Sequence, residues 1–163
     1  LYNIEFPLIL IGPSKLEAFI IETFQHMGII HNQDLNYISI ADQSDIKLYK
    51  GINLHALEME HTIPCWGYSL TDGSRKLAFV TDTRKNANTV KLAKNADILI
   101  HEATFQHHQR DKAWKYFHST VIQAMEIADS SHVKRLILTH FSQRLRDKDV
   151  QEWTWNGQPC VVT

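Results

Sequence analysis

Residues 76–104 carry the pattern that sets the architecture of this chain, and their sequence is KLAFVTDTRKNANTVKLAKNADILIHEAT. Lys76–Thr81 and Ile98–Ile100 are short apolar runs, which are typical of buried strands. Ala87–Asn95 lies between them and is predicted to form a helix. A strand, a helix and another strand in this order predict an α/β fold, because the helix must pack against the sheet to which the strands belong.

The pattern continues on both sides of this segment. Toward the C-terminus, a helix is predicted near Thr120–Ala128 and a strand at Leu136–Leu138. Toward the N-terminus, the strand Trp66–Leu70 reaches Lys76–Thr81 across the turn Thr71–Ser74. Short alternating segments predict further antiparallel strands at Tyr37–Ile40, Ile46–Tyr49 and Leu54–Glu60. The chain is therefore predicted to be a layered α/β protein with a mixed sheet.

The first part of the chain is predicted to contain a strand, a tight turn and a helix. Leu8–Ile11 is a short apolar run that ends at Gly12-Pro13. Ser14 and Glu17 then have the spacing of a capping box, which predicts a helix from this point through about Met27.

Bulk composition limits the class of protein. A chain of 163 residues with 44% hydrophobic composition can form one domain, residues 1–163, with a real core and no linker. Its 17 basic and 18 acidic residues nearly cancel, so any nucleic-acid contact must be local. Cys65 and Cys160 lie outside any CxxC pattern, and Pro7–Ile11 is too short to span a bilayer. We therefore expect a cytoplasmic protein with no membrane partner and no thiolate zinc site.

Three potential metal ligands occupy equivalent places, each where an apolar strand runs into a loop. They are His61, Asp82 and His140, in a chain with ten histidines. A single histidine at a strand end is more often only a polar terminus, but the combination favours a metal site. Imidazole and carboxylate without thiolate suit zinc or manganese in a hydrolytic site.

Two further segments carry polar groups that suit such a site. His118 directly precedes a predicted helix in which Thr120 and Gln123 have capping-box spacing, and a helix start is a favourable place for a phosphate. The simpler interpretation is a helix cap preceded by an incidental histidine. Glu102 ends a buried strand and would fix the tautomer of a neighbouring imidazole, unless it is only a surface carboxylate.

Taken together, these segments resemble ribonuclease Z, the tRNA 3′-processing endonuclease branch of the metallo-β-lactamase fold. The matching segments, in order, are Ile11–Pro13, Glu60–Tyr68, Thr81–Arg84, His101–Phe105, His118–Thr120 and Leu138–Arg144. The His-Glu-Ala-Thr-Phe and His-Ser-Thr pieces separate this branch from other hydrolases of the same fold.

The resemblance implies an αβ/βα sandwich, a two-metal phosphodiesterase site and RNA, in the form of precursor tRNA, as the substrate. His61 would bind one ion, Asp82 would bridge two, and His140 would bind the other, with zinc favoured over manganese. His118 would contact the scissile phosphate or protonate the leaving oxygen, and Glu102 would support it as a second catalytic residue. The residues expected to contact phosphate or substrate are Ser119, Thr120, Arg84, Arg144 and Arg146.

The sequence departs from the family in two respects. The His-x-His-x-Asp-His signature is absent from these 163 residues, so we expect the C-terminal portion of a longer protein, inactive alone. Half of a two-sheet sandwich also leaves an apolar sheet face that demands a partner, and a homodimer is expected. Tyr68 reaches Asp82 through a single turn, where many bacterial members carry a long insertion. This keeps two alternatives open: hydrolysis of a smaller phosphodiester such as a cyclic nucleotide, or a non-catalytic half-domain.

Overall fold

The structure is a computed structural model that describes residues 8–28, 35–40, 43–145, 150 and 152–160. The chain divides into two compact units, Leu1–Ser44 and Asp45–Thr163. A single domain spanning all 163 residues stays a prediction. None of the helices in the described ranges is long and apolar enough to span a membrane.

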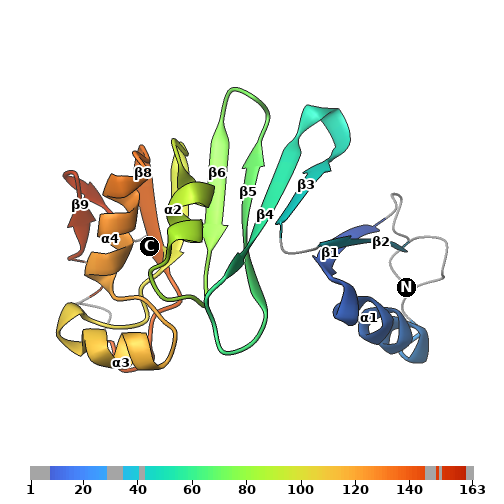
Figure 1. The fold of residues 1–163 in the computed structure, drawn as a ribbon, viewed down its shortest axis with the longest axis horizontal. Coiled ribbons are helices and arrows are strands. Elements are labelled where there is room, and N and C mark those ends of the chain that lie inside the picture. The colour runs from blue at the N-terminus through green and yellow to red at the C-terminus, as the bar shows by residue number, and fades with distance from the viewer. Residues whose placement is uncertain (1–7, 29–34, 41–42, 146–149, 151, 161–163) are drawn as a thin grey trace. The chain divides into compact units, whose positions relative to one another are not determined.

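The described residues of the first unit form two parallel strands and one helix (Figure 1). They are β1 (Leu8–Pro13), α1 (Ser14–His26) and β2 (Leu35–Ile40). The predicted strand and helix are confirmed, but the antiparallel arrangement predicted for Tyr37–Ile40 is wrong. A helix between two neighbouring strands returns the chain to the same end of the sheet, so β2 runs parallel to β1.

The capping box predicted at the start of α1 is also wrong. The residue that caps the helix is Pro13, and no side chain caps the first turn. Pro13 instead accepts a hydrogen bond from the Tyr37 hydroxyl through its carbonyl oxygen, at 2.8 Å. The same hydroxyl would lie 2.7 Å from a Cβ at residue 12, so a larger residue there would displace the Tyr37 hydroxyl from this bond.

The second unit is built on a mixed sheet with the strand order β3-β4-β5-β6-β7-β8. The strands are β3 (Gln43–Lys47), β4 (Asn53–Met59), β5 (Cys65–Thr71), β6 (Lys76–Val80), β7 (Ile98–Glu102) and β8 (Arg135–Thr139). The pairs β4–β5 and β5–β6 are antiparallel, whereas β6–β7 and β7–β8 are parallel. The predicted α/β fold with a mixed sheet is confirmed.

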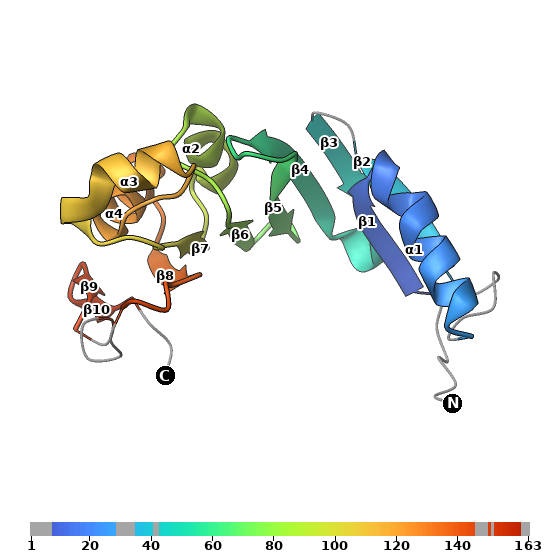
Figure 2. The ribbon, with the colours of Figure 1, turned by 90° about the horizontal axis from the view of Figure 1, so that it is seen from below.

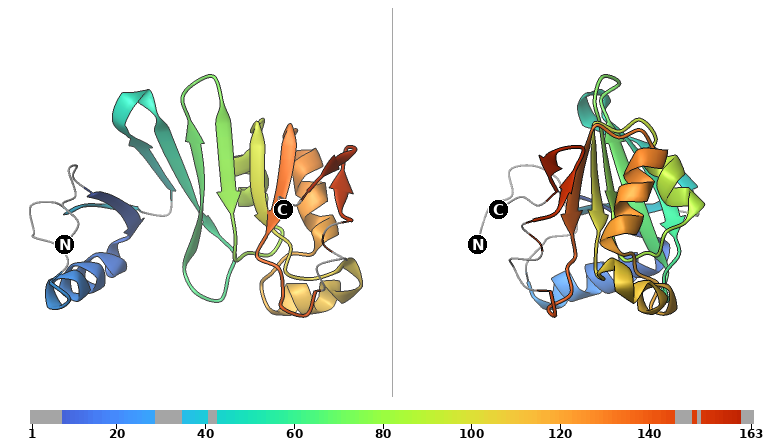
Figure 3. Two further views of the ribbon diagram at one scale, coloured as in Figure 1. Left: turned by 180° about the vertical axis from the view of Figure 1, so that it is seen from behind. Right: turned by 90° about the vertical axis from the view of Figure 1, so that its left-hand side faces the viewer.

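Three helices lie on one face of this sheet (Figures 2 and 3). They are α2 (Ala87–Ala93), α3 (Arg110–Lys115) and α4 (Val121–Ser130). Both predicted helices are present, and α4 begins with the predicted capping box between Thr120 and Gln123. The sequence did not indicate α3, the short 3-10 helices η1 (Tyr49–Gly51) and η2 (His107–Gln109), or the small hairpin of β9 (Thr154–Trp155) and β10 (Gln158–Pro159).

The two faces of the sheet differ in how well they are covered. Side chains alternate between faces along a strand. Ala78, Val80 and Leu99 belong to the buried core with the helices and are fully shielded from solvent. On the other face, Phe79 pairs with Ile100, and Phe79 remains 43% exposed. An apolar surface is therefore only partly covered.

The β5–β6 hairpin closes through a tight turn at Asp72. Its carboxylate accepts hydrogen bonds from the backbone N–H groups of Arg75 and Ser74, both at 2.8 Å, and from the Ser74 hydroxyl at 2.9 Å. These bonds, that of the Arg75 N–H above all, lower the pKa of Asp72 to about 2. The predicted single turn between Tyr68 and Asp82 is confirmed.

Candidate metal centre

Three strands that run in the same direction place the candidate ligands at one edge of the sheet. β4 and β6 each pair antiparallel with β5, and β6 to β8 are mutually parallel, so β4, β6 and β8 share one direction. His61 follows the end of β4, Asp82 the end of β6, and His140 the end of β8. Ligands far apart in the sequence are thereby brought to one edge.

The structure brings His61, Asp82 and His140 together with His118. The Nε2 atom of His140 lies 3.1 Å from Oδ1 of Asp82. Ligand atoms of His61, Asp82 and His118 lie within 4.8 Å of one another, and so do those of Glu102, His118 and His140. The His118 ring centroid is 5.2 Å from that of His61 and 5.4 Å from that of His140. These groups surround a space in which a metal ion could be bound.

In each of the three imidazoles the Nδ1 atom already has a neighbour. Nδ1 of His61 lies 3.3 Å from the Phe117 carbonyl oxygen, and that of His118 lies 3.0 Å from a Glu102 oxygen. Nδ1 of His140 lies 2.9 Å from the Thr104 hydroxyl. Engaging one ring nitrogen fixes the tautomer and orientation of a histidine ligand, and it leaves Nε2 available to an ion.

The donor chemistry fits a divalent ion in a hydrolytic site. Imidazole nitrogens and a carboxylate are the ligands that zinc accepts in such sites. Cys65 lies close by, but burial, reinforced by the charges of Asp82 and Glu102, raises the pKa of its thiol to about 11. Among the described residues, the ligand atoms that gather at this site are imidazole nitrogens and carboxylate oxygens.

The backbone is strained at two of these strand ends. Asp82 has φ of 51° and His140 has φ of 55°, both in the left-handed region. Phe117, directly before His118, has φ of 59°. Residues other than glycine rarely adopt this conformation, which costs about 1–3 kcal/mol and is concentrated at functional sites. At these strand ends the chain turns sharply where the side chains meet.

The Glu102 side chain is fully buried at the end of β7 and forms hydrogen bonds with residues around the cluster. Its Oε1 accepts the Thr83 N–H at 2.6 Å, and its Oε2 accepts the Ser119 N–H at 2.9 Å and the Thr104 hydroxyl at 2.7 Å. Burial alone would raise the pKa of Glu102. The hydrogen bonds from His118 and the Ser119 N–H, with the charge of His118, outweigh burial and hold that pKa below its usual value.

The same contact changes the protonation of His118. Its hydrogen bond with Glu102 raises the pKa of His118 above its usual value, although partial burial opposes the shift, and the negative charges of Glu102 and Asp82 add to it. An imidazole whose pKa is raised binds its proton more tightly, and beside a metal site it is suited to donate a proton or to contact a phosphate. The imidazole that Glu102 was predicted to hold is thus His118.

Two residues predicted to contact phosphate use their side chains in hydrogen bonds within the protein. Ser119 and Thr120 are fully buried. The Ser119 hydroxyl donates to the Thr83 carbonyl oxygen at 2.8 Å, and the Thr120 hydroxyl accepts the Gln123 N–H as the helix cap. The structure does not bring these hydroxyls to the surface of the site, and their contact with phosphate stays a prediction.

The Arg84 side chain links the residue before His61 to two aromatic rings in and after α3. Its Nε donates to a Glu60 carboxylate oxygen at 2.6 Å, and its guanidinium lies 3.9 Å from the Trp114 ring centroid and 4.4 Å from that of Phe117. Because Glu60 directly precedes His61, these contacts hold the end of β4 near Asp82. A phosphate contact of Arg84 stays a prediction.

Arg144 and Arg146 complete the set of predicted basic contacts. Arg144 is exposed and lines a cavity beside the site. Arg146 lies outside the described residues. A phosphate contact stays a prediction for both.

Sequence reasoning missed the part that Thr104 plays. Its hydroxyl donates to Glu102 and also lies within hydrogen-bond distance of Nδ1 of His140, so it links the ends of β7 and β8. The signal was the hydroxyl two residues after a buried carboxylate at a strand end, where it can reach that carboxylate without leaving the sheet edge.

Comparisons with known proteins place this arrangement in a family. The model of the beta-lactamase superfamily domain matches residues 11–141. The chain belongs to the beta-lactamase superfamily. Within this superfamily, ribonuclease BN of Proteus mirabilis is 29% identical, over 91% of this chain and 65% of that protein. Ribonuclease Z of Enterococcus faecalis is 47% identical over 78 residues, which are 48% of this chain and 25% of that protein.

A solved structure of the same superfamily agrees with the fold. The short form of human tRNase Z has a TM-score of 0.73 and 29% identity, covering 86% of this chain and 62% of that one. The chain is thus a member of the beta-lactamase superfamily that is similar to ribonucleases Z and BN. It spans somewhat less than two thirds of the length of the ribonuclease BN and tRNase Z that it matches.

Proposed function

We propose that this chain belongs to a metal-dependent phosphodiesterase of ribonuclease Z type that hydrolyses RNA, in the manner of tRNA 3′ processing. The observation that supports this most is the convergence of three imidazoles on Asp82, each with its Nδ1 already engaged. His61, Asp82 and His140 would hold two divalent ions, with Asp82 between them. Such ions supply Lewis acidity toward phosphoryl oxygens, and zinc suits the donor set better than manganese.

In this proposal His118 acts on the substrate rather than on the metal. Its Nδ1 is hydrogen-bonded to Glu102, and the raised pKa favours the protonated ring. The free Nε2–H can then contact a non-bridging phosphate oxygen or protonate the leaving oxygen. Glu102 keeps the ring oriented and charged, which makes it a positioning residue.

We further propose that residues outside these 163 complete the site. A two-ion site needs more protein donors than His61, Asp82 and His140 provide, since each zinc ion is normally held by three or more protein ligands. The relatives are longer than this chain, which agrees with additional donors elsewhere. The 163-residue chain by itself should then bind metal weakly and turn over little substrate.

The first test measures metal binding by the chain and by two matched variants. Asp82→Ala should lower zinc binding at least tenfold, because the carboxylate is the central donor. Asp111→Ala removes a fully exposed carboxylate on α3 and should leave zinc binding unchanged. Equal zinc binding by all three proteins would refute the metal site.

The second test separates the roles of His118 and Asp82. The chain is supplemented with the His-x-His-x-Asp-His fragment of a relative, and cleavage of precursor tRNA is measured. His118→Ala should lower turnover roughly 10²- to 10⁴-fold with metal content unchanged, the usual range for a positioned proton donor. Loss of the metal in His118→Ala would make His118 a ligand, and unchanged turnover would reduce it to part of a helix cap.

One observation favours a second substrate class, a smaller phosphodiester such as a cyclic nucleotide. The β5–β6 hairpin closes at Asp72 without any long insertion. The alignment with the Proteus protein spans 198 positions, yet 91% of this chain is about 148 residues, so about 50 positions match no residue here. Comparing kcat/KM for precursor tRNA and for a cyclic nucleotide, in the supplemented chain, decides between the two substrates.

The partly covered sheet face supports a proposal about assembly. Phe79 and Ile100 form part of an apolar surface that a second copy of the chain could cover. We propose that the chain forms a homodimer in the cytoplasm. If the chain binds no metal, the alternative is a non-catalytic half-domain. Sedimentation equilibrium of wild type and Phe79→Lys tests the dimer: a wild type that is monomeric at all concentrations would exclude it.

A further inference from the structure

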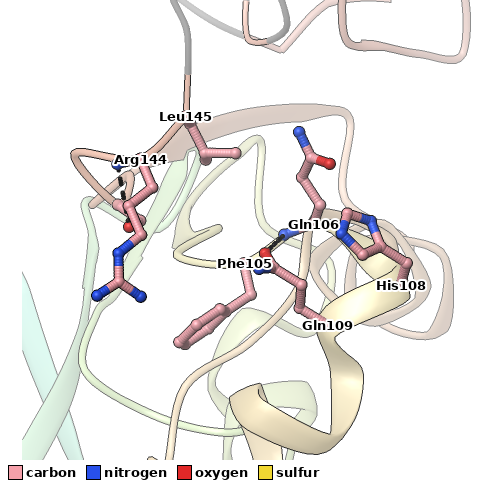
Figure 4. A pocket seen from close by; sticks show the side chains of 7 residues that line it. Phe105, Gln106, His108, Gln109, Arg144 and Leu145 are labelled. Atoms are coloured by element: carbon pink, nitrogen blue, oxygen red, sulfur yellow. Dashed lines mark hydrogen bonds between the residues drawn. The ribbon is translucent and has the colours of Figure 1, made fainter.

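A cavity of about 260 Å³ opens beside the candidate metal centre (Figure 4). One wall comes from the segment that follows β7 and contains Phe105, Gln106 and Gln109. The opposite wall comes from the segment that follows β8 and contains Arg144 and Leu145. Ligand pockets for drug-sized molecules occupy roughly 300–1,000 Å³, so this cavity suits a smaller group such as one ring system.

Both walls of the cavity contain residues that lie close to residues of the site. The Phe105 ring centroid is 6.2 Å from that of His118. Thr104, directly before Phe105, contacts His140, and Ser142 on the other wall lies two residues after His140. A ligand with a phosphate at His118 would therefore have its neighbouring group at the mouth of this cavity.

The lining combines the groups that single-stranded nucleic acid requires. Phe105 offers an aromatic ring, on which a base of any kind can stack. The Gln109 side chain accepts the Gln106 N–H through Oε1 at 3.4 Å, which leaves its amide NH₂ free to donate to a base edge. Arg144 supplies a positive charge, and among the described residues the lining contains no carboxylate.

A second hollow, which shares Gln106 and His108 with this cavity, is less suited to this ligand. It is lined by Val121, Met125, Trp153 and the carboxylate of Glu152. The negative charge of Glu152 disfavours a phosphate group in this hollow. The cavity at Phe105 is therefore the better candidate for a nucleotide.

We propose that the cavity at Phe105 binds one nucleobase of a single-stranded RNA, next to the nucleotide whose phosphate lies at His118. The base stacks on Phe105 and accepts a hydrogen bond from the Gln109 NH₂ group, while Arg144 contacts the adjoining phosphate. This inference rests on the proposed function for its RNA substrate. The binding itself requires no metal, so the two can be tested apart.

The test uses a fluorescein-labelled five-nucleotide RNA and fluorescence anisotropy in the presence of a metal chelator. In a set of matched RNAs, one base at a time is replaced by an abasic ribose. One abasic position should weaken binding by the full chain roughly 5- to 150-fold, the effect of losing one base–aromatic stack. Phe105→Leu should weaken binding of the parent RNA by a similar factor, and its combination with that abasic RNA should add little, because both changes remove the same contact.

Three variants make the test specific. Phe105→Tyr keeps the aromatic ring and should restore binding. Phe19→Leu makes the same change as Phe105→Leu at a 65% exposed phenylalanine of the first unit and should have no effect. Arg144→Gln should lower the slope of log affinity against log salt by about 0.7, the value for one phosphate contact on a single strand.

The outcomes separate this inference from the proposed function. If every abasic RNA binds like the parent, or if the losses from Phe105→Leu and the abasic base add in full, the nucleobase site is refuted. Weak binding by Phe105→Tyr would refute it as well, and so would a chain that binds none of the RNAs. If zinc binding fails while base-dependent RNA binding is present, the catalytic proposal falls and the nucleobase site stands.

Discussion

Glu102→Gln should destabilise the protein almost as much as removal of the whole side chain. Both carboxylate oxygens accept a buried backbone N–H, Oε1 from Thr83 and Oε2 from Ser119. A glutamine amide has only one oxygen. In either orientation its NH₂ group faces one of these N–H donors, so one buried donor loses its acceptor and a second donor is placed against it.

The magnitude follows from the bonds that are lost. A hydrogen bond to a charged group contributes about 1.5–3 kcal/mol, and a buried donor left without a partner costs about 1–3 kcal/mol. Glu102→Gln removes the charge, one backbone contact and the ion pair with His118 at 3.0 Å. We therefore expect a loss of about 3–5 kcal/mol in the free energy of unfolding, the range for breaking a buried charged network.

The assay is urea unfolding followed by tryptophan fluorescence, with Glu126→Gln as the matched control. Glu126 pairs with Lys85 at the surface, where an ion pair contributes about 0–1 kcal/mol. The pKa of Glu102 lies below its usual 4.5, so its contribution should be complete above pH 4.5 and should shrink as the pH falls through the lowered pKa. A Glu102→Gln protein within 0.5 kcal/mol of wild type at pH 7 would refute the reasoning.

Three further outcomes are expected. Gly67→Ala places a Cβ 2.7 Å from Met59 Cε in the core, so urea unfolding should show a loss of about 1–3 kcal/mol, and an unchanged midpoint would contradict the packing. In metal-free protein, NMR titration should show that the pKa of His118 lies above 6.5 and that it is lower in Glu102→Gln. The stabilisation that protonated His118 contributes to the fold is complete below pH 6.5 and is lost as the pH rises through the raised pKa. Cys65, whose thiol has a pKa of about 11, should react with iodoacetamide at pH 8 far more slowly in the folded than in the urea-unfolded chain, and equal rates would show that the thiol is not shielded.

The strands and helices of the second unit could be predicted because local sequence decides them. The apolar run that ends at Val80 and the run Ile98–Ile100 flank one predicted helix, so their parallel pairing follows. The direction of β2 could not be predicted from alternation, since that pattern is the same in parallel and antiparallel strands. It depends on the helix that precedes β2. The cap of α1 was missed because the Tyr37 hydroxyl, 24 residues beyond Pro13, crosses the turn.

The candidate site also has one part that the sequence could predict and one part that it could not. His61, Asp82 and His140 could be selected because a polar residue directly after an apolar strand is a local signal. The contacts that orient them could not be predicted, because they join different loops. Phe117 reaches His61 through a backbone carbonyl, which no side-chain pattern indicates, and Thr104 joins two strand ends.

The left-handed backbone at Asp82 and His140 affects how mutagenesis at these positions should be interpreted. Alanine is usually treated as the neutral deletion, but at a positive φ its Cβ costs roughly 1 kcal/mol relative to glycine. A glycine at position 140 would delete the imidazole and relieve the backbone together, so a variant that has lost its ligand could be more stable than the wild type. A screen that selects only for stability would therefore tend to remove the very residues that make this sheet edge a metal site.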